Sequence, residues 1–394
     1  MKLALVVQRY GADIAGGSEA HCRLLAERLA AAHDVTVLTT CATDYVTWEN
    51  ARQAGMTVEA GVTVQRFAVA RPRALSRFRD LSDRVFAFGS DATEQVEWFR
   101  ENGPDVPALL DHLRRHGRDY DLVLFWTFRY APSFFGLPLV ADRAVLLPTA
   151  EEDAAIGLSV LADYFSKPAA FLFLTPEERR LVLSRARRPT EVSAVIGVGL
   201  DPAAAVPPST PPVDGRYVLY LGRIDRNKGC GALFEYFADY LAVRNDVTLV
   251  LAGPAKMVVP THPRIRAMGY VDDALRERLL VGADALIVPS PYESLSMVLL
   301  EAWNHGVPAL VNGQCAVLAG QVQRANGGLA YRSSREFRAC LDYLLDRPDE
   351  RRTLGAQGLA YVEREYRWPT VLTRVEEVLA AARRTRSMPA TENS

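Results

Sequence analysis

Lysine is scarce in this chain: of the 46 basic Lys and Arg residues, only Lys2, Lys167, Lys228 and Lys256 are lysines. Acidic residues number 47, so the formal net charge is −1. A chain without an excess of positive charge lacks the bulk attraction that draws proteins to nucleic acid or anionic membranes. The sequence therefore predicts no nucleic-acid partner, while local basic patches leave peripheral association with a membrane open.

Long apolar runs and paired cysteines are also missing. Only five consecutive residues after Lys2 are apolar, fewer than the hydrophobic region of a signal peptide needs. No window approaches the ~20 apolar residues of a membrane-spanning helix. The five cysteines are widely spaced and form no Cys-x-x-Cys pair, which is typical of reduced thiols. We therefore expect a cytoplasmic chain without a membrane span.

The chain does contain enough apolar residues for more than one core. It has 394 residues, of which 49% are hydrophobic, and a single core rarely covers that length. Short β-rich runs alternate with amphipathic helical runs, a pattern typical of parallel sheets covered by helices. The sequence thus predicts α/β units with strands at 3–8, 35–40, 62–69, 121–126, 144–149, 169–175, 192–197, 217–222, 247–253, 265–271, 285–290 and 308–313.

A proline-rich segment, LDPAAAVPPSTPPVDG at 200–215, separates the two sets of strands. Proline disrupts regular helix and central strand, so we place a domain boundary here. The predicted domains are a first Rossmann-like unit, a linker, a second Rossmann-like unit, and a carboxy-terminal helix with a frayed tail, at 1–200, 201–214, 215–368 and 369–394.

The stretch PSPYESLSMVLLEAWNHGVPALV, residues 289–311, is apolar enough to be core yet carries Glu293 and Glu301. We predict a strand, a loop, and a helix that begins near Ser294 with Glu301 about two turns in. The first amides of such a helix favour an anion. A solvated surface helix capped by Ser294 is the alternative interpretation. The amides in question belong to Leu295, Ser296, Met297 and Val298.

A second motif, YLGRIDRNKG at 220–229, follows the first strand of the second unit. Gly222 allows close approach, and Arg223 and Lys228 place two cations on the loop before the next helix. Two fixed cations suit a diphosphate. A solvated turn is the alternative, because this composition is common in loops.

A third motif, RYGADIAGGSEAHC at 9–22, leads from the first strand of the chain into its first helix. Gly16 and Gly17 would let backbone approach a ligand, and Ser18 is placed to cap the helix with Glu19 in its first turn. The motif is not G-x-G-x-x-G, which argues against a nicotinamide dehydrogenase.

Taken in order, these pieces resemble a known family. GGSE, LGRIDRNKG, LAGP, GYVDD, ADALIVPSPYESLSMVLLEAWNHGVPALV and GGLAY follow one another as in the retaining glycosyltransferases of family 4, the glycosyl transferases group 1. The resemblance covers nearly the whole chain. It implies a GT-B fold of two facing Rossmann-like domains with an inter-domain cleft. The first domain would lie on the acceptor side, the second would bind the nucleotide sugar, and the last helix would return to the first.

The resemblance also implies roles for individual residues. Glu301 would accept the ribose hydroxyls of the donor, and Glu293 would contact hydroxyls of its sugar. The base would meet the backbone at Tyr270 and Val271. The diphosphate would be held without a metal or cofactor by Arg223, Lys228, Gly16, Gly17 and the amides of Leu295, Ser296, Met297 and Val298.

Two departures from the family pattern concern the donor sugar. Ser294 and Ser296 stand where the family has glycines. In LLPTAEEDAA, residues 146–155, Glu151 lies where the family usually places a histidine near the reacting carbon. No histidine occurs between residues 117 and 261, and His21 fits a helix-surface or satisfied packing residue. We therefore expect Glu151 to take part in catalysis.

The acceptor side is indicated by FWTFRYAPSFF, residues 125–135, which is dense in aromatic residues after a strand. Aromatic faces stack on sugar rings, although clusters in strands are also common in cores. We expect Trp126, Arg129 and Tyr130 to contact the acceptor.

The sequence thus predicts a metal-independent, retaining glycosyltransferase. It would move a hexose-like sugar from a nucleotide-diphosphate sugar to a hydroxyl of a carbohydrate or small-molecule acceptor. Two alternatives stay open: a catalytically silent subunit that binds sugar nucleotide, and a sugar-nucleotide epimerase or hydrolase. The predicted catalytic residues are Glu151, Arg223, Lys228 and Glu293.

Overall fold

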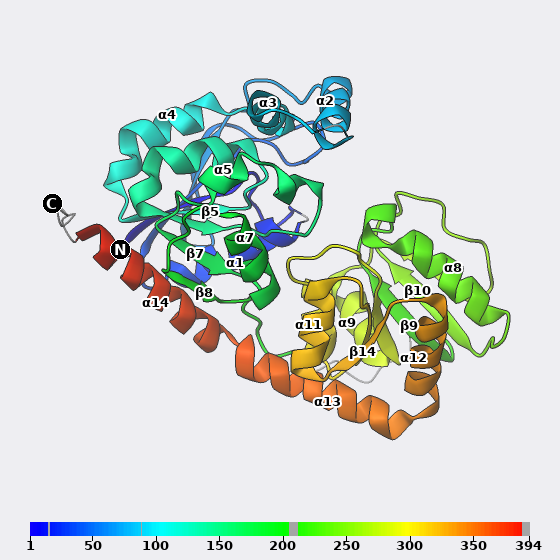
Figure 1. Cartoon of the computed structure of the whole chain (residues 1–394). Helices are drawn as coiled ribbons and strands as arrows, with labels where there is room; N and C mark the ends of the chain where they lie inside the picture. The colour runs from blue at the N-terminus through cyan, green and yellow to red at the C-terminus, as the bar shows by residue number, and fades with distance from the viewer. Residues whose placement is uncertain (15, 88, 205–211, 388–394) are drawn as a thin grey trace. The chain divides into compact units, whose positions relative to one another are not determined.

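A computed structural model of the chain describes residues 1–14, 16–87, 89–204 and 212–387. The chain divides into two compact units, each built on one β-sheet (Figure 1). The amino-terminal unit comprises residues 1–199 and the segment from residue 372 onward, and the carboxy-terminal unit comprises residues 200–371. Part of the predicted linker, 205–211, and the predicted tail after residue 387 lie outside the described residues.

The described residues of the amino-terminal unit form an eight-stranded sheet in the order β3-β4-β2-β1-β5-β6-β7-β8. Neighbouring strands are parallel except β3 and β4. The central strands are buried and apolar, as expected for a parallel sheet covered on both faces. The strands are β1 (Lys2–Val6), β2 (Asp34–Thr40), β3 (Gly55–Glu59), β4 (Val62–Phe67), β5 (Leu122–Trp126), β6 (Ala144–Leu147), β7 (Ala170–Phe173) and β8 (Ser193–Val195).

Helices make most of the crossovers in this unit, because a tight turn cannot join parallel neighbours. The last helix, α14 (Trp368–Ser387), groups with this unit from Leu372 onward, and its Glu376 Oε1 lies 2.6 Å from His33 Nε2. The other helical segments are α1 (Gly17–Leu29), α2 (Leu75–Ala87), α3 (Ala92–Asn102), α4 (Pro107–His116), η1 (Gly117–Asp119), α5 (Ala131–Gly136), η2 (Leu137–Arg143), η3 (Ala154–Gly157), α6 (Leu161–Tyr164) and α7 (Pro176–Arg185).

The carboxy-terminal unit has a six-stranded parallel sheet among its described residues, in the order β11-β10-β9-β12-β13-β14. This is the strand order of a Rossmann fold. Its elements are β9 (Arg216–Leu221), η4 (Arg226–Lys228), α8 (Cys230–Leu241), β10 (Val247–Ala252), β11 (Ile265–Gly269), α9 (Asp273–Gly282), β12 (Ala285–Val288), α10 (Met297–Asn304), β13 (Ala309–Asn312), α11 (Ala316–Ala325), β14 (Gly328–Tyr331), α12 (Ser334–Asp346) and α13 (Pro348–Glu365).

The twelve strands expected from the sequence are all present, and two further strands, β3 and β14, were not predicted. β3 is mostly exposed, so its sequence carries little of the apolar alternation by which strands are found. The predicted start of the helix near Ser294 is wrong, because α10 begins at Met297. Glu301 is therefore the fifth residue of α10, about one turn from its start instead of two.

In each sheet, successive strands are first added on one side of the starting strand and then on its other side. In the carboxy-terminal unit the chain moves outward from β9 to β10 and β11, then returns to β12 on the other side of β9. In the amino-terminal unit the corresponding pair is β1 and β5. Open α/β sheets bind ligands beyond the carboxyl ends of such strand pairs. A ligand site is therefore expected at the loops after β1, β5, β9 and β12.

All five cysteines have free thiols. Among the described residues, no helix has the combination of length and apolar character that crossing a membrane requires.

Candidate functional site

The loop after β9 carries both predicted cations. Asp225 caps η4, since its Oδ1 accepts a hydrogen bond from the Lys228 amide at 2.9 Å. Its Oδ2 forms an ion pair with Arg223 Nε. One carboxylate therefore orients the backbone at Lys228 and the guanidinium of Arg223.

The loop after β12 is tied to the loop after β9 by an ion pair, in which Lys228 Nζ lies 2.8 Å from Glu293 Oε1. The lysine side chain is 33% exposed and the glutamate 11%, so water still reaches the pair. Gly229 has φ 76°, and a Cβ there would lie 2.1 Å from the Pro289 carbonyl oxygen. Glycine is thus required for the two loops to approach, and the structure brings Lys228 and Glu293 together.

Helix α10 starts at Met297, four residues after Glu293, with Ser296 as its N-cap residue. The Ser296 side chain makes no capping bond, and its buried Oγ has no hydrogen-bond partner among the described residues. Buried polar atoms are nearly always bonded in folded proteins. An anion at this helix start would meet the first-turn amides and the Ser296 hydroxyl together.

Glu301 offers a second unmatched group on the same helix. Its Oε1 lies 3.0 Å from Arg276 Nη2, whereas its buried Oε2 has no hydrogen-bond partner within the described residues. Burial raises the pKa of Glu301, and the nearby Arg276 guanidinium opposes that rise. An incoming hydroxyl group would satisfy the unmatched oxygen by donating to it.

The two residues predicted to contact the base lie after β11. Tyr270 follows that strand directly and is 86% exposed, and Val271 is half-buried. Gly253, after β10, has φ 142°, and a Cβ there would lie 2.0 Å from the Gly222 carbonyl oxygen. This close approach packs the loop after β10 against the loop after β9.

The glycine loop after β1 differs from its prediction. Gly16 is the N-cap residue of α1 and no side chain caps the helix, so the predicted capping role of Ser18 is wrong. Glu19 accepts hydrogen bonds from Gln8 Nε2 and Arg9 Nε, both at 2.9 Å, and all three side chains are buried. A Cβ on Gly16 would lie 2.2 Å from Glu19 Oε2, so a larger residue at this position would displace the Glu19 carboxylate.

Two expectations about aromatic side chains near this loop are wrong. Trp126 is fully buried and has no face to offer an acceptor, so it is not an acceptor contact in this structure. Its ring packs edge-on against His21, with centroids 5.9 Å apart. His21 is also buried, and its ring nitrogens have no hydrogen-bond partner among the described residues. Burial lowers the pKa of His21 to about 4, so this residue is neither a surface nor a satisfied packing histidine.

The other predicted acceptor residues lie in the loop between β5 and α5. Arg129 Nη2 lies 2.7 Å from Asp153 Oδ2, and the Tyr130 ring packs edge-on against Trp48 with centroids 5.2 Å apart. Asp153 belongs to the segment after β6 that also contains Glu151. The structure therefore joins the two loops in which acceptor and catalytic residues were predicted.

Both of these loops contain strained backbone. Thr127, directly after β5, has φ 55°, and Thr149, two residues before Glu151, has φ 46°. Such angles are outliers for β-branched residues, and strain of this kind concentrates at functional sites. The amide of Thr127 donates to the Leu147 carbonyl oxygen at 2.8 Å, which links the two strained segments.

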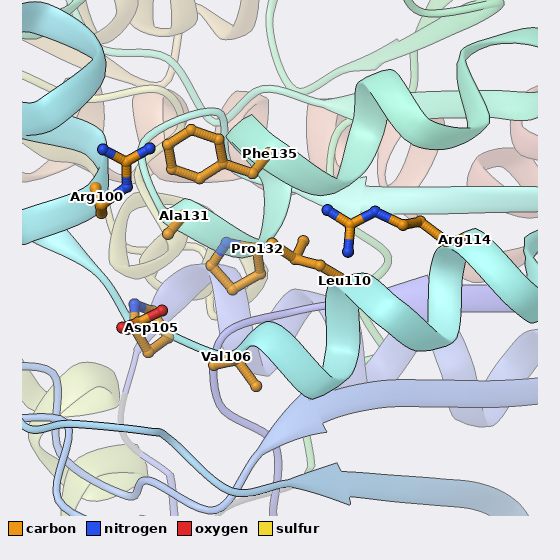
Figure 2. Close-up of a pocket in the computed structure, with 9 residues that line it drawn as sticks. Arg100, Asp105, Val106, Leu110, Arg114, Ala131, Pro132 and Phe135 are labelled. Atoms are coloured by element: carbon orange, nitrogen blue, oxygen red, sulfur yellow. The ribbon is translucent and has the colours of Figure 1, made fainter.

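A pocket of about 250 Å³ is lined by residues of α3, α4 and α5 and of the loop before α4. Figure 2 shows the side chains that line it, among them Arg100 and Arg114. Its two arginines are engaged with acids on their own helices. Arg100 Nη1 lies 2.6 Å from a Glu97 oxygen, and Arg114 Nη1 lies 2.5 Å from an Asp111 oxygen. Arg223 and Lys228 are paired with acids as well, but the buried unmatched oxygens of Ser296 and Glu301 have no counterpart among the residues that line this pocket.

Comparison with known proteins agrees with this geometry. The family model described as Glycosyl transferases group 1 matches residues 215–347, which include the loops after β9 and β12 and helix α10. The chain is a glycosyltransferase. This confirms the predicted enzyme class.

Relatives extend the similarity along the chain. The glycogen synthase of Mycobacterium tuberculosis (strain CDC 1551 / Oshkosh) is 25% identical to this glycosyltransferase, over 99% of this chain and 97% of the relative. Sucrose-phosphate synthase from Thermosynechococcus elongatus has a TM-score of 0.69 at 17% identity, covering 96% and 98% of the two chains. A trehalose-6-phosphate protein from E. coli, bound with UDP-2-fluoro glucose, has a TM-score of 0.73 at 12% identity, covering 96% and 99%. The predicted GT-B fold class is confirmed.

Sequence reasoning missed two residues that orient the predicted ones. Asp225 lies three residues before Lys228, a spacing typical of an N-cap, so a local signal was present. Arg276, which holds Glu301, lies on α9 and had no such signal, because the pairing depends on how two helices pack.

Proposed function

We propose that this glycosyltransferase moves a hexose-like sugar from a nucleotide-diphosphate sugar to an acceptor hydroxyl, with retention of anomeric configuration. The observation that best supports this proposal is the arrangement of side chains beyond β9 and β12, where the connections of the carboxy-terminal sheet change direction. There, two oriented cations meet a helix start whose Ser296 hydroxyl is unmatched, and an unmatched Glu301 oxygen lies one turn further on. This combination suits a diphosphate attached to a ribose.

Arg223, Lys228 and the α10 amides hold the diphosphate in this proposal. Lys228 would exchange its bond to Glu293 for one to a phosphate oxygen, which leaves the Glu293 carboxylate to accept a hydroxyl of the donor sugar. Charge on the diphosphate grows as its bond to the sugar breaks, so fixed cations favour departure. The acceptor would attack from the side the diphosphate leaves, as retention requires.

In the amino-terminal unit we assign donor contacts to Gly16 and Gly17, catalysis to Glu151, and acceptor contacts to Arg129 and Tyr130. The strained segments beside Thr127 and Thr149 support these assignments. The base is assigned to the backbone at Tyr270 and Val271. The five free thiols favour a reducing compartment, and we propose the cytoplasm.

A donor panel tests this function. Thermal unfolding is measured with UDP, GDP, ADP and dTDP and their glucose conjugates, and a ligand at 100 times its dissociation constant stabilises by about 2.7 kcal/mol. The stabilising conjugate is then incubated with and without a saccharide acceptor. Acceptor-dependent release of the nucleoside diphosphate supports transfer, release without acceptor indicates a hydrolase, an isomerised donor indicates an epimerase, and binding without turnover indicates a silent subunit.

Metal removal is expected to leave the rate unchanged. Arg223 and Lys228 supply the positive charge that a divalent cation provides in metal-dependent transferases. Initial rates with the confirmed donor are compared in excess EDTA and in millimolar Mg²⁺ or Mn²⁺. A rate that collapses in EDTA and returns with either cation would refute metal independence.

Glu301→Ala is expected to weaken nucleotide binding by about 1 to 3 kcal/mol, because a charged hydrogen-bond acceptor for the ribose is lost. Titration calorimetry with the nucleoside diphosphate measures the change. Glu235→Ala, which removes an exposed glutamate from α8 of the same unit, is the control with matched charge. If wild type and Glu301→Ala bound the nucleotide with equal affinity, Glu301 would not be a ribose-binding residue.

A further inference from the structure

Glu178 is a fully buried carboxyl group on the first turn of α7 that the proposed chemistry does not use. Its two oxygens accept hydrogen bonds from two different backbone segments. Oε1 accepts from the Ala150 amide at 2.7 Å, and Oε2 accepts from the Leu174 amide at 2.6 Å. The side chain therefore bridges the segment after β6 to the end of β7.

The bridged segment is the one that carries Glu151. Ala150 lies between Glu151 and the strained Thr149, and its bond to Glu178 fixes the peptide directly after the strained residue. A left-handed β-branched residue persists only where its surroundings hold it. Arg129 holds the same segment as well, through its ion pair with Asp153.

Burying a carboxyl group so that it accepts hydrogen bonds from two amides costs desolvation free energy. Burial raises the pKa of Glu178, whereas the hydrogen bonds from the Leu174 and Ala150 amides favour the ionised carboxylate and oppose that rise. The carboxyl group is not needed to cap α7, because Thr175 already does so. Its Oγ1 accepts a hydrogen bond from the Glu178 amide at 3.1 Å. What the carboxyl adds is a pair of acceptors facing two donors at once.

We infer that Glu178 is a positioning residue, which holds Glu151 in its working orientation by bridging the Ala150 and Leu174 amides. The inference rests on the proposed catalytic role of Glu151. Glu178→Gln tests it with little change of shape, since glutamine offers one acceptor oxygen and its NH₂ group would face the other amide.

Four variants of the full chain separate positioning from stability: Glu178→Gln, Thr175→Ala, Glu151→Ala and the double variant Glu151→Ala/Glu178→Gln. Thr175→Ala removes the cap of α7 and leaves the carboxyl bridge, so it reports what a loss of stability alone does. Steady-state kinetics with the confirmed donor and acceptor and calorimetry with the nucleoside diphosphate are measured on each, together with the midpoint of thermal unfolding.

Glu178→Gln is expected to lower kcat at least fivefold at unchanged nucleotide affinity, whereas Thr175→Ala lowers the unfolding midpoint and keeps kcat within twofold of wild type. The double variant should be no slower than Glu151→Ala, because a residue that acts only through Glu151 has nothing left to position. Glu178→Asp serves where Glu178→Gln does not fold, and the same loss of kcat is expected.

The outcomes that overturn the inference are distinct from those that overturn the function. If Glu151→Ala is slow while Glu178→Gln or Glu178→Asp turns over normally, Glu178 does not position Glu151. Multiplied losses in the double variant also exclude a role through Glu151. Normal turnover in Glu151→Ala refutes the proposed role of Glu151 itself, and the inference with it.

Discussion

Lys228→Ala is expected to lower kcat by about 100- to 1,000-fold, the loss typical when one preorganised donor to a developing negative charge is removed. Nucleotide affinity should fall much less, because the positive charge is needed most when the bond to the sugar breaks. The variant also leaves Glu293, whose side chain is only 11% exposed, without the lysine that neutralises it. A carboxylate without that counterion would repel the diphosphate and add to the loss.

The control for this experiment is Lys167→Ala. It removes the same charge from an exposed position just before β7, in a part of the amino-terminal unit where no site residue is predicted. Rates are measured at saturating acceptor, and affinity is measured by calorimetry with the nucleoside diphosphate. If Lys228→Ala turned over like Lys167→Ala, the diphosphate would have to be held elsewhere.

The sheets could be predicted from the sequence because their central strands are continuous apolar runs. β5 and β12 are buried at every residue, and their apolar runs are bounded by turn residues and too short for a buried helix. β3 was missed for the opposite reason, since its side chains are mostly exposed on an edge strand. The start of α10 was misplaced because Ser294 and Ser296 both suit a cap, and only the observed backbone distinguishes them.

The residues of the site also divide into those with a local sequence signal and those without one. Arg223, Lys228 and Glu293 were found because each lies in the connection that leaves the carboxyl end of a strand, where parallel sheets place their ligands. The partners of these residues were harder to find. Glu19 lies in the first turn of α1, as expected, but its buried ion pair with Arg9 had no signal in the sequence, because Arg9 comes from a different segment. Trp126 was misassigned because an aromatic residue at a strand end has the same sequence pattern in a core as at a surface.

Glu151 stands where the family usually has a histidine, and the properties of a carboxylate limit what this residue can do. A histidine can donate a hydrogen bond to the donor sugar, whereas an ionised glutamate can only accept one. An ionised Glu151 could accept a sugar hydroxyl or stabilise the positive charge that develops at the anomeric carbon. A protonated Glu151 would instead donate, as the histidine does. Glu151→Gln distinguishes these roles because it keeps a donor and an acceptor but removes the charge.

We expect Glu151→Ala and Glu151→Gln both to lower turnover at least tenfold, about 1.4 kcal/mol of barrier, while nucleotide binding survives. Near-normal turnover in Glu151→Gln alone would mean that hydrogen bonding, not charge, is what the residue supplies. Glu152→Ala is the matched control, because it removes an exposed acid from the next position of the same segment. Steady-state kinetics at saturating donor decide the matter: if Glu151→Ala were as fast as Glu152→Ala, the carboxylate would have no part in the chemistry, and the strain at Thr149 would need another explanation.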